Sequence, residues 1–276
     1  MRPFIAKLAA VVGLALGGSA SAHAAWGLNM PQGVTPLSRE TYDLHMLIFW
    51  ICTIIGVVVF GAILISLIRF RKSKGSVAAQ WHESMAAEVS WTLVPFLILV
   101  GMAIPAAQTL IKMEDNSGSD LTVTITGYQW NWHYEYVDED VDFYSFLSTS
   151  RQAILDEAPK GEDYLLEVDN RLVLPVGAKV RLHHTSGDVI HSWWVPDLSV
   201  KKDAIPGYVN TNWIQIEEPG VYTGQCAELC GRGHGFMPIV VEALPQDEFD
   251  AWLEEQKQQA QASVEDGGAL LAATRQ

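Results

Sequence analysis

Two long apolar stretches near the start of the chain limit most strongly what it can fold into. Residues 46–68 and 89–111 each contain about 23 residues without a charged side chain, enough for a helix to cross a hydrocarbon core of roughly 30 Å. A buried helix of a soluble protein is the alternative, but such helices are usually shorter. The first stretch is also followed at once by a basic cluster. The two stretches therefore predict a transmembrane helical hairpin over residues 46–112.

The basic cluster gives the expected orientation of this hairpin. Four cations within residues 69–74 begin the connecting loop at 69–88. Such cations stay on the cytoplasmic side, so both outer flanks of the hairpin are expected outside the cytoplasm. Residues 1–24 have the charged start, short apolar run and Ala-His-Ala cleavage site of a secretory signal peptide. The mature chain is expected to begin after them with a periplasmic segment at 25–45.

From residue 113 to 245 the pattern changes to short strand-like runs. Residues 121–126 alternate between apolar and polar side chains, and residues 128–136 are rich in aromatic ones; both patterns are typical of strands. Further strands are predicted at 164–168, 171–175, 179–184, 189–195, 211–217, 220–226 and 238–243, with an irregular excursion at 138–163. Many short strands without helices between them predict an all-β sandwich or barrel. The end of the chain, 246–276, is predicted to be a helix at 246–262 and then a flexible tail.

Charge is distributed unevenly along the chain. The formal net charge is -14, yet residues 113–276 alone carry 28 acidic and 10 basic side chains, a balance of -18. An acidic surface repels nucleic acid and attracts a basic protein partner in a salt-dependent way. Acidity that only keeps the domain soluble is the alternative, and composition does not decide between the two.

Five soft metal-ligand side chains lie on two segments near the end of the β region. The first segment contains His191, and the second contains Cys226, Cys230, His234 and Met237. Thiolate, imidazole and thioether together select copper over hard cations. One thiolate is enough for a single copper ion, so the second sulfur favours two ions that share bridging thiolates. We therefore predict a binuclear copper centre for electron transfer.

Two simpler interpretations of the same residues remain open from the sequence. Cys226 and Cys230 are close enough along the chain to form a disulfide, which the predicted location outside the cytoplasm permits. Together with His191 and His234 they would also make a tetrahedral zinc site. Met237 would then have no metal role and would be a core residue.

Several longer motifs, taken with these side chains, resemble one family. They begin at Gly127 (GYQWNWHYEY), Leu166 (LEVDNRLVLP), Asp188 (DVIHSW), Asp203 (DAIPG) and Gly224 (GQCAELCGRGHGFM). With the hairpin they cover nearly the whole mature chain and are similar to cytochrome c oxidase subunit II, the copper A subunit of haem–copper oxidases. The resemblance implies an all-β cupredoxin-like Greek-key sandwich or barrel at residues 113–245, preceded by a two-helix transmembrane hairpin.

The resemblance also implies how the binuclear copper A centre is held. The family's ligand positions are all filled here, by His191, Cys226, Glu228, Cys230, His234 and Met237. The two cysteines correspond to the bridging thiolates, the two histidines to the terminal imidazoles, and Met237 to an axial thioether. Glu228 corresponds to the residue whose main-chain oxygen is the other axial ligand. Its side chain is expected at a magnesium or manganese ion on the boundary with subunit I.

Other positions correspond to the family's sites for the electron donor and for protons. Trp130 corresponds to the tryptophan through which cytochrome c delivers its electron. Glu135, Asp169 and Asp188 correspond to acidic residues of the face on which cytochrome c docks. Glu88 corresponds to the acidic mouth of a proton-uptake route.

Two positions beside this tryptophan depart from the family pattern. Asn131 stands where tyrosine is usual, and His133 where serine is usual. Contacts of the donor next to Trp130 are therefore expected to differ from those of other members.

The implied function is that of the electron-accepting subunit of a respiratory terminal oxidase in the bacterial inner membrane. Both termini and the copper domain are expected on the periplasmic side. Electrons from periplasmic cytochrome c would reach haem in subunit I, which also holds copper B, where oxygen is reduced to water and protons are pumped. The expected partners are subunit I, subunit III, cytochrome c and membrane lipid, with no nucleic acid. The sequence contains no Cys-x-x-Cys-His motif, so the donor is expected to be a separate cytochrome c.

Two other functions are compatible with parts of this pattern. The first is the electron-accepting part of a nitrous oxide or nitric oxide reductase. In nitrous oxide reductase, however, a copper A loop follows a large catalytic domain, for which this chain is expected to have no room. The second is a tethered copper carrier or sensor, which would bind one labile copper ion rather than two.

Overall fold

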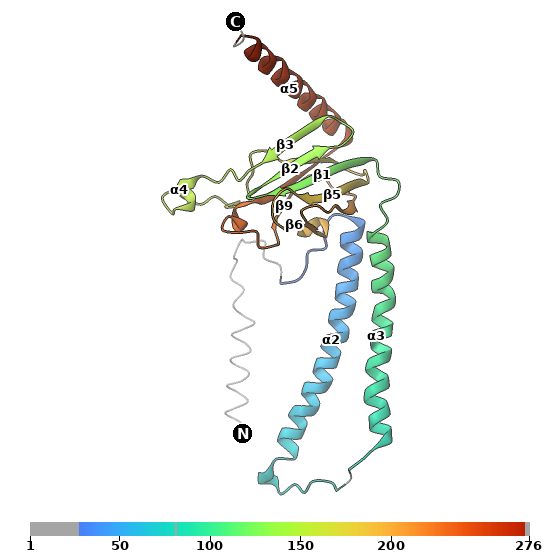
Figure 1. Cartoon of the computed structure of the whole chain (residues 1–276). Helices are drawn as coiled ribbons and strands as arrows, with labels where there is room; N and C mark the ends of the chain where they lie inside the picture. Colours follow the sequence, from blue (N-terminus) through green and yellow to red (C-terminus); the bar gives the residue numbers. More distant parts are fainter. Residues whose placement is uncertain (1–27, 81, 274–276) are drawn as a thin grey trace. The chain divides into compact units, whose positions relative to one another are not determined.

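The computed structural model of the chain describes residues 28–80 and 82–273, with side chains through residue 262 (Figure 1). The predicted signal peptide at residues 1–24 and its cleavage site lie outside the described residues.

Two long helices, α2 (Pro36–Arg69) and α3 (Met85–Met113), form the predicted hairpin and run side by side (Figure 1). The start of α2 is capped by two reciprocal hydrogen bonds. The hydroxyl of Thr35 accepts the Ser38 N–H, and the hydroxyl of Ser38 accepts the Thr35 N–H. This reciprocal cap satisfies donors that a helix start leaves free. Among the described residues, α2 and α3 are the helices long and apolar enough to cross a membrane. Both extend beyond the spans predicted from the charge-free stretches, and a short turn, η1 (Lys72–Lys74), lies between them.

A β-sandwich follows, and within the described part of the chain it consists of two five-stranded sheets. The first sheet has the order β3–β2–β1–β5–β8 and the second the order β4–β10–β9–β6–β7. The strands are β1 (Leu121–Tyr128), β2 (Asn131–Tyr136), β3 (Val141–Ser145), β4 (Leu172–Pro175), β5 (Val180–Ser186), β6 (His191–Val195), β7 (Val200–Ala204), β8 (Asn210–Ile214), β9 (Gly220–Cys226) and β10 (Pro238–Leu244).

Neighbouring strands are antiparallel except for β1 with β5 and β4 with β10, which are parallel. Parallel neighbours cannot be joined by a tight turn. The chain accordingly crosses from the first sheet to the second after β3, returns to the first for β5, and leaves it again for β6. The predicted class, an all-β sandwich preceded by a two-helix hairpin, is confirmed.

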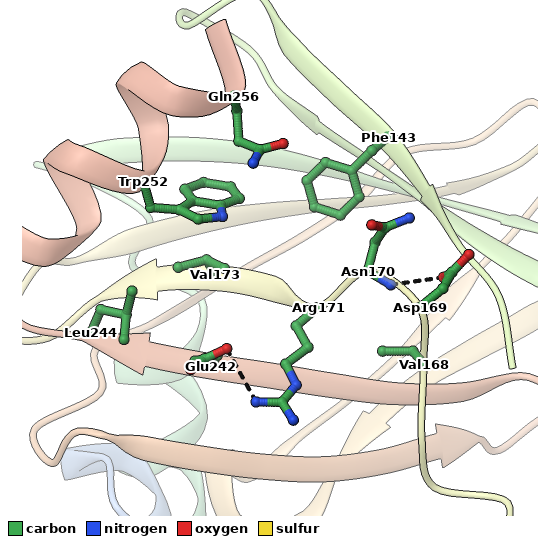
Figure 2. A pocket seen from close by; sticks show the side chains of 10 residues that line it. All are labelled: Phe143, Val168, Asp169, Asn170, Arg171, Val173, Glu242, Leu244, Trp252 and Gln256. Carbon is green, nitrogen blue, oxygen red and sulfur yellow. Dashed lines mark hydrogen bonds and ion pairs between the residues drawn. The ribbon is translucent and has the colours of Figure 1, made fainter. Parts of the chain in front are cut away.

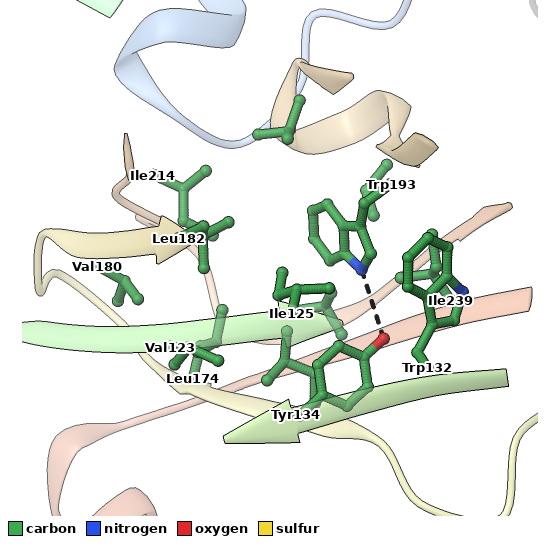
Figure 3. Packing of buried hydrophobic residues seen from close by; sticks show 14 of the residues in the cluster. Val123, Ile125, Trp132, Tyr134, Leu174, Val180, Leu182, Trp193, Ile214 and Ile239 are labelled. Carbon is green, nitrogen blue, oxygen red and sulfur yellow. Dashed lines mark hydrogen bonds between the residues drawn. The ribbon is translucent and has the colours of Figure 1, made fainter. Parts of the chain in front are cut away.

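One apolar core lies between the two sheets (Figure 3). Trp132, Tyr134 and Tyr136 alternate along β2 and are all fully buried, because every second side chain of a strand faces the same side. The Nε1–H of Trp193 donates to the Tyr134 hydroxyl at 3.4 Å across the sheets, and the Tyr136 hydroxyl donates to the Val173 carbonyl at 2.6 Å. These bonds satisfy the polar ends of buried aromatic side chains. They fix the strands that carry the candidate site.

The predicted strand at 128–136 is wrong in one respect that matters for function. β1 ends at Tyr128 and β2 begins at Asn131, so Gln129 and Trp130 form the turn of a hairpin. The aromatic pattern runs through this turn without the glycine or asparagine that usually marks one. Trp130 is therefore held at the end of the sandwich and not along a strand.

The segment between β2 and β4 also differs from the prediction. The excursion expected at 138–163 contains β3 and a short helix, α4 (Arg151–Ile154). The strand expected at 164–168 does not form: residues 162–165 make turns, Leu165 has a left-handed φ of 63°, and only Val168 pairs, with Leu147. A left-handed residue interrupts an extended run.

β7 is a strand that the sequence did not predict. Its central residues, Lys201, Lys202 and Asp203, are charged, and only Val200 and Ala204 at its ends are buried. β7 is the edge of the second sheet, where charged side chains are common because they discourage pairing with other chains.

The terminal helix, α5 (Gln246–Ala273), begins where predicted and extends past residue 262, where a flexible tail was expected. Phe249 and Leu253 are buried against the sandwich. Lys257 donates to the Glu139 carboxylate at 2.6 Å. The first turns of α5 are therefore attached to the β2–β3 end of the domain.

Candidate metal centre

The candidate ligands come together because β6 and β9 are neighbours. His191 opens β6, Cys226 closes β9, and Trp193 is paired with Cys226 in the register of the two strands. The N–H of Ala227 donates to the Ser192 carbonyl at 2.9 Å, which ties the next loop to the start of β6. We call residues 227–237, between β9 and β10, the metal loop. It contains the short helix η3 (His234–Phe236) and ends at Met237, directly before β10.

Within this arrangement the sulfur and nitrogen atoms lie close together. The Sγ atoms of Cys226 and Cys230 are 3.9 Å apart. The Nδ1 of His191 is 3.9 Å from the Cys226 sulfur, and the Nδ1 of His234 is 3.6 Å from the Cys230 sulfur. The Sδ of Met237 is 3.5 Å from the Cys230 sulfur. Each sulfur therefore has its own imidazole, on a different segment of the chain.

Four of these five donor residues are almost entirely removed from solvent, and His234 is partly exposed. His191 and Met237 are 0% and 1% exposed, and Cys226 and Cys230 are 6% and 4% exposed. A buried thiol and imidazole cluster of this kind is shielded from water and sits in a low dielectric, the conditions under which a protein controls the properties of a bound metal.

The geometry separates the interpretations that the sequence left open. Both cysteines are free thiols, and their 3.9 Å separation is far above the roughly 2.05 Å of a disulfide. Two sulfurs that bind one ion at about 2.3 Å each must be less than about 4.6 Å apart, and this pair meets that condition. The Cys226–Cys230 disulfide is therefore contradicted, and shared metal binding by the two sulfurs fits.

The position of His234 bears on the zinc alternative. His191, Cys226 and Cys230 have ligand atoms that all lie within 4.8 Å of one another. In the described part of the chain, His234 does not join this group, although its Nδ1 is 3.6 Å from the Cys230 sulfur. A single tetrahedral ion needs all four ligands around one point. The arrangement favours two metal positions, one beside each imidazole.

The two thiols differ in acidity. Burial raises the pKa of Cys226, but hydrogen bonds from His191 and from backbone groups of Ser192 and Glu228 bring it down to about 7. Burial and the charge of Cys226 raise the pKa of Cys230 to about 12. One thiolate therefore forms readily near neutral pH, while a metal ion has to displace the proton of the other, as metals do when they bind cysteine.

Asp188 holds the candidate ligand His191 in place. The Nε2–H of His191 donates to Asp188 Oδ1 at 2.9 Å, so that Nδ1 faces Cys226. The other carboxylate oxygen accepts the backbone N–H of Gln129 at 2.7 Å. Gly127 leaves room for the imidazole, since a Cβ at that position would be 2.8 Å from the His191 ring. The sequence analysis predicted a docking role for Asp188 and did not predict its hydrogen bond with His191. The spacing of three residues between Asp188 and His191 is the signal that would have indicated this bond.

The predicted tryptophan is in direct contact with the metal loop. The Nε1–H of Trp130 donates to the Cys230 carbonyl at 3.3 Å, and the side-chain amide of Gln129 donates to the same oxygen at 2.7 Å. A Cβ on Gly233 would be 2.3 Å from the Trp130 ring, so the ring lies against the bare backbone of the loop. The sequence did not single out Gln129. Its role depends on the hairpin turn that was also missed.

Glu228 and Met237 take different positions relative to the sulfurs. The main-chain oxygen of Glu228 is 3.3 Å from the Cys226 sulfur, and its side chain is exposed. Met237 is buried, and its carbonyl accepts the Nε1–H of Trp132 at 3.3 Å. The structure thus brings both predicted axial positions to the thiol pair.

The remaining predicted residues lie apart from this cluster. Glu135 is exposed on β2, and Glu88 is in the first turn of α3. Asp169 accepts the backbone N–H groups of Phe146 and Asn170, each at 2.7 Å. It lines a pocket of about 510 Å³ beneath α5, which none of the candidate ligands line (Figure 2).

Comparisons with known proteins match most of the chain. The family model for the periplasmic domain of cytochrome c oxidase subunit II matches residues 121–244, and the model for its transmembrane domain matches residues 23–109. A probable cytochrome c oxidase subunit 2 of Rickettsia bellii is 38% identical over 255 residues, which are 91% of this chain and 93% of that protein. Cytochrome c oxidase subunit 2 of Cereibacter sphaeroides is 33% identical over 261 residues, 90% of this chain and 85% of that protein. The crystal structure of the periplasmic domain of subunit II of cytochrome oxidase of Bradyrhizobium japonicum is 39% identical and covers 51% of this chain and 96% of that domain, with a TM-score of 0.46.

Proposed function

This chain belongs to the cytochrome c oxidase subunit II family, and from that premise we propose that it is the subunit through which electrons reach a haem–copper terminal oxidase. Electrons from periplasmic cytochrome c pass through this subunit to haem in subunit I, where oxygen is reduced to water and protons are pumped. The observation that carries the proposal is the pair of buried thiols, 3.9 Å apart, each beside its own imidazole.

The proposed centre is binuclear copper. Cys226 and Cys230 bridge the two ions, while His191 and His234 are their terminal ligands. The thioether of Met237 and the main-chain oxygen of Glu228 are the axial donors. When bound, the copper pair supplies a one-electron carrier that soft sulfur and nitrogen donors stabilise. The protein's own contribution is a set of ligands held by β6, β9 and β10, so that little has to move when an electron arrives or leaves.

Trp130 is the proposed point at which the electron arrives. Its ring lies against the metal loop, and its N–H donates to the carbonyl of Cys230. One hydrogen bond and the backbone of a single residue therefore connect the indole with a bridging sulfur. Asp188 supports the same path from the other side, because it holds both Gln129 and His191.

The acidic domain is the proposed docking surface for cytochrome c. With 28 acidic and 10 basic residues from 113 to 276, it attracts a basic donor over a distance and raises the rate of association. Glu135, Asp169 and Asp188 are the proposed contacts. For Asp188 and Asp169 this role is additional to the hydrogen bonds that each already accepts.

The remaining assignments concern the membrane and the partner subunits. The proposed orientation places the loop after α2 in the cytoplasm and the β-sandwich in the periplasm of a bacterial inner membrane. Subunit I and subunit III are the proposed neighbours. The exposed side chain of Glu228 is proposed to reach a magnesium or manganese ion at the boundary with subunit I. Glu88 lies in the first turn of α3, roughly 38 Å along the helix from its end at Met113. It is proposed to be the entrance of a proton-uptake route.

Metal analysis of the full-length subunit, purified in detergent and loaded with copper, tests this proposal. The expected result is two copper ions per chain and a paramagnetic signal in which one unpaired electron is shared by both. Cys226→Ser should abolish that shared signal. A single copper ion, or zinc in material isolated from the native membrane, would contradict the proposal and favour a carrier or a structural site.

A further inference from the structure

The side chain of Arg232 lies over the ring at which the electron is proposed to arrive. The guanidinium carbon of Arg232 is 5.7 Å from the centroid of the Trp130 ring, within the range of a cation–π contact. Arg232 lies between Gly231 and Gly233, and added Cβ atoms on these glycines would be 3.1 and 2.3 Å from the same ring. The metal loop therefore approaches Trp130 with its backbone and places a guanidinium over it.

Within the described ranges, no carboxylate forms an ion pair with this cation. Elsewhere in the domain, ion pairs with carboxylates are made by Lys160, Arg171, Lys202 and Lys257. Arg232 is exposed and forms no such pair among the residues that the structure describes. A domain with 28 acidic and 10 basic residues thus has an unpaired positive charge directly at Trp130.

We propose that Arg232 is a positioning and specificity-determining residue for electron donation, an inference that rests on the proposed function. Its guanidinium holds the Trp130 ring against the metal loop. The positive charge of Arg232 selects, among basic donor proteins, a donor that has a carboxylate beside the exposed edge of the donor's redox cofactor. A guanidinium has five N–H donors in a planar fork that matches a carboxylate, and lysine lacks that geometry. A donor with a uniformly basic rim meets a like charge at Trp130.

The donor preference can be measured on the assembled oxidase with stopped-flow kinetics. Two probes are needed: a basic cytochrome c with a lysine-rich haem rim, and the same protein with one rim lysine replaced by glutamate. Arg232→Gln should raise the ratio of the second-order rate constant for the lysine-rimmed donor to that for the glutamate-rimmed donor by roughly tenfold at low ionic strength. The loss of the charge changes the two rate constants in opposite directions, each by about threefold, the factor for one charge pair about 7 Å apart in water, whereas a shift of the Trp130 ring affects both donors equally. The change in this ratio should disappear at high salt.

Two further variants make the result specific. Arg151→Gln removes the same charge from α4 and should leave the preference between the two donors unchanged. Arg232→Lys retains the charge and should restore the wild-type rate constant for the lysine-rimmed donor.

The positioning role has a readout that needs neither copper nor donor. Acrylamide quenching of tryptophan fluorescence in the full-length subunit should increase in Arg232→Gln, because the ring becomes more accessible. The increase should be absent when Trp130 is replaced by phenylalanine in the same chain. Equal quenching in wild type and Arg232→Gln would overturn the positioning role.

Different results would contradict the role of Arg232 and the electron path through Trp130. If Trp130→Phe slows electron uptake but Arg232→Gln behaves like Arg151→Gln with both donors, the inference about Arg232 is overturned and the proposed function stands. If Trp130→Phe has no effect on electron uptake, the proposed path through Trp130 is overturned, and the donor selection by Arg232 falls with it.

Discussion

The Asp188 carboxylate and the His191 imidazole are 2.9 Å apart, and this contact decides which ring nitrogen faces the thiols. Because Nε2–H donates to Asp188, Nδ1 is left with its lone pair on the side of Cys226, 3.9 Å from the sulfur. The same carboxylate accepts the N–H of Gln129, one residue before Trp130. A single side chain therefore positions both a proposed metal ligand and the proposed electron path.

Asp188→Asn is expected to weaken metal binding about 10- to 100-fold, since loss of the partner that orients a ligating histidine has costs of that order. Competition with a chelator of known affinity, on the full-length subunit, measures the change. Asp142→Asn is the matched control, because Asp142 makes a similar 2.8 Å contact with His133 on the outer face of the first sheet. Equal affinities of the two variants would mean that Asp188 does not orient the ligand.

Gly233→Ala is expected to slow electron uptake from cytochrome c while both copper ions remain bound. A Cβ at this position would be 2.3 Å from the Trp130 ring, so the ring must move away from the metal loop. Displacements of about 1 Å in a reacting group reduce rates by on the order of 100-fold. Stopped-flow reduction of the oxidase measures the effect. Gly235→Ala, two residues on, has nothing within 4 Å of its Cβ and should behave as wild type; a normal rate in Gly233→Ala would show that the position of Trp130 is unimportant.

The fold class and the grouping of the candidate ligands could be predicted because residue type and local pattern indicate them. Soft ligands at Cys226, Cys230 and His234 favour copper, although these residue types alone leave a zinc site or a disulfide open. A charge-free run indicates a membrane helix, and alternation of apolar side chains indicates a strand. Each of these signals is contained in a short window of sequence.

What could not be predicted depends on contacts between distant segments. The turn at Gln129 and Trp130 is hidden in an aromatic run and is set by the pairing of β1 with β2. The contact of Asp188 with Gln129 joins residues 59 positions apart, and the cation of Arg232 reaches Trp130 only because the metal loop folds back onto that turn. The hydrogen bonds around the candidate ligands are therefore a property of the folded chain that no short window of sequence contains.

Met237→Leu is expected to retain two copper ions but to shift the reduction potential of the centre. Met237 is 1% exposed and its sulfur is 3.5 Å from the Cys230 sulfur, so leucine removes the proposed axial donor while filling a similar volume. Swaps of this kind usually cost less than about 1.5 kcal/mol in stability. Redox titration followed by the optical spectrum measures the potential. Ile239→Val, at an equally buried site in β10, controls for packing changes, and a shift no larger than in that variant would remove Met237 from the axial role.

His184 is expected to make the β-sandwich sensitive to acid. Its ring is 0% exposed, Nε2–H donates to Asn212 at 2.6 Å, and Nδ1 has no partner within the described residues. Burial lowers its pKa from 6.5 to about 4. Between pH 6.5 and 4 the unfolded chain binds a proton that the folded chain does not, so stability falls as the pH falls, by on the order of 3 kcal/mol in all. His184→Gln, which can still donate to Asn212, should flatten this pH dependence in thermal unfolding of the full-length subunit, whereas the same change at the partly exposed His183 should flatten it much less. An unaltered acid profile in His184→Gln would assign the loss of stability to other groups.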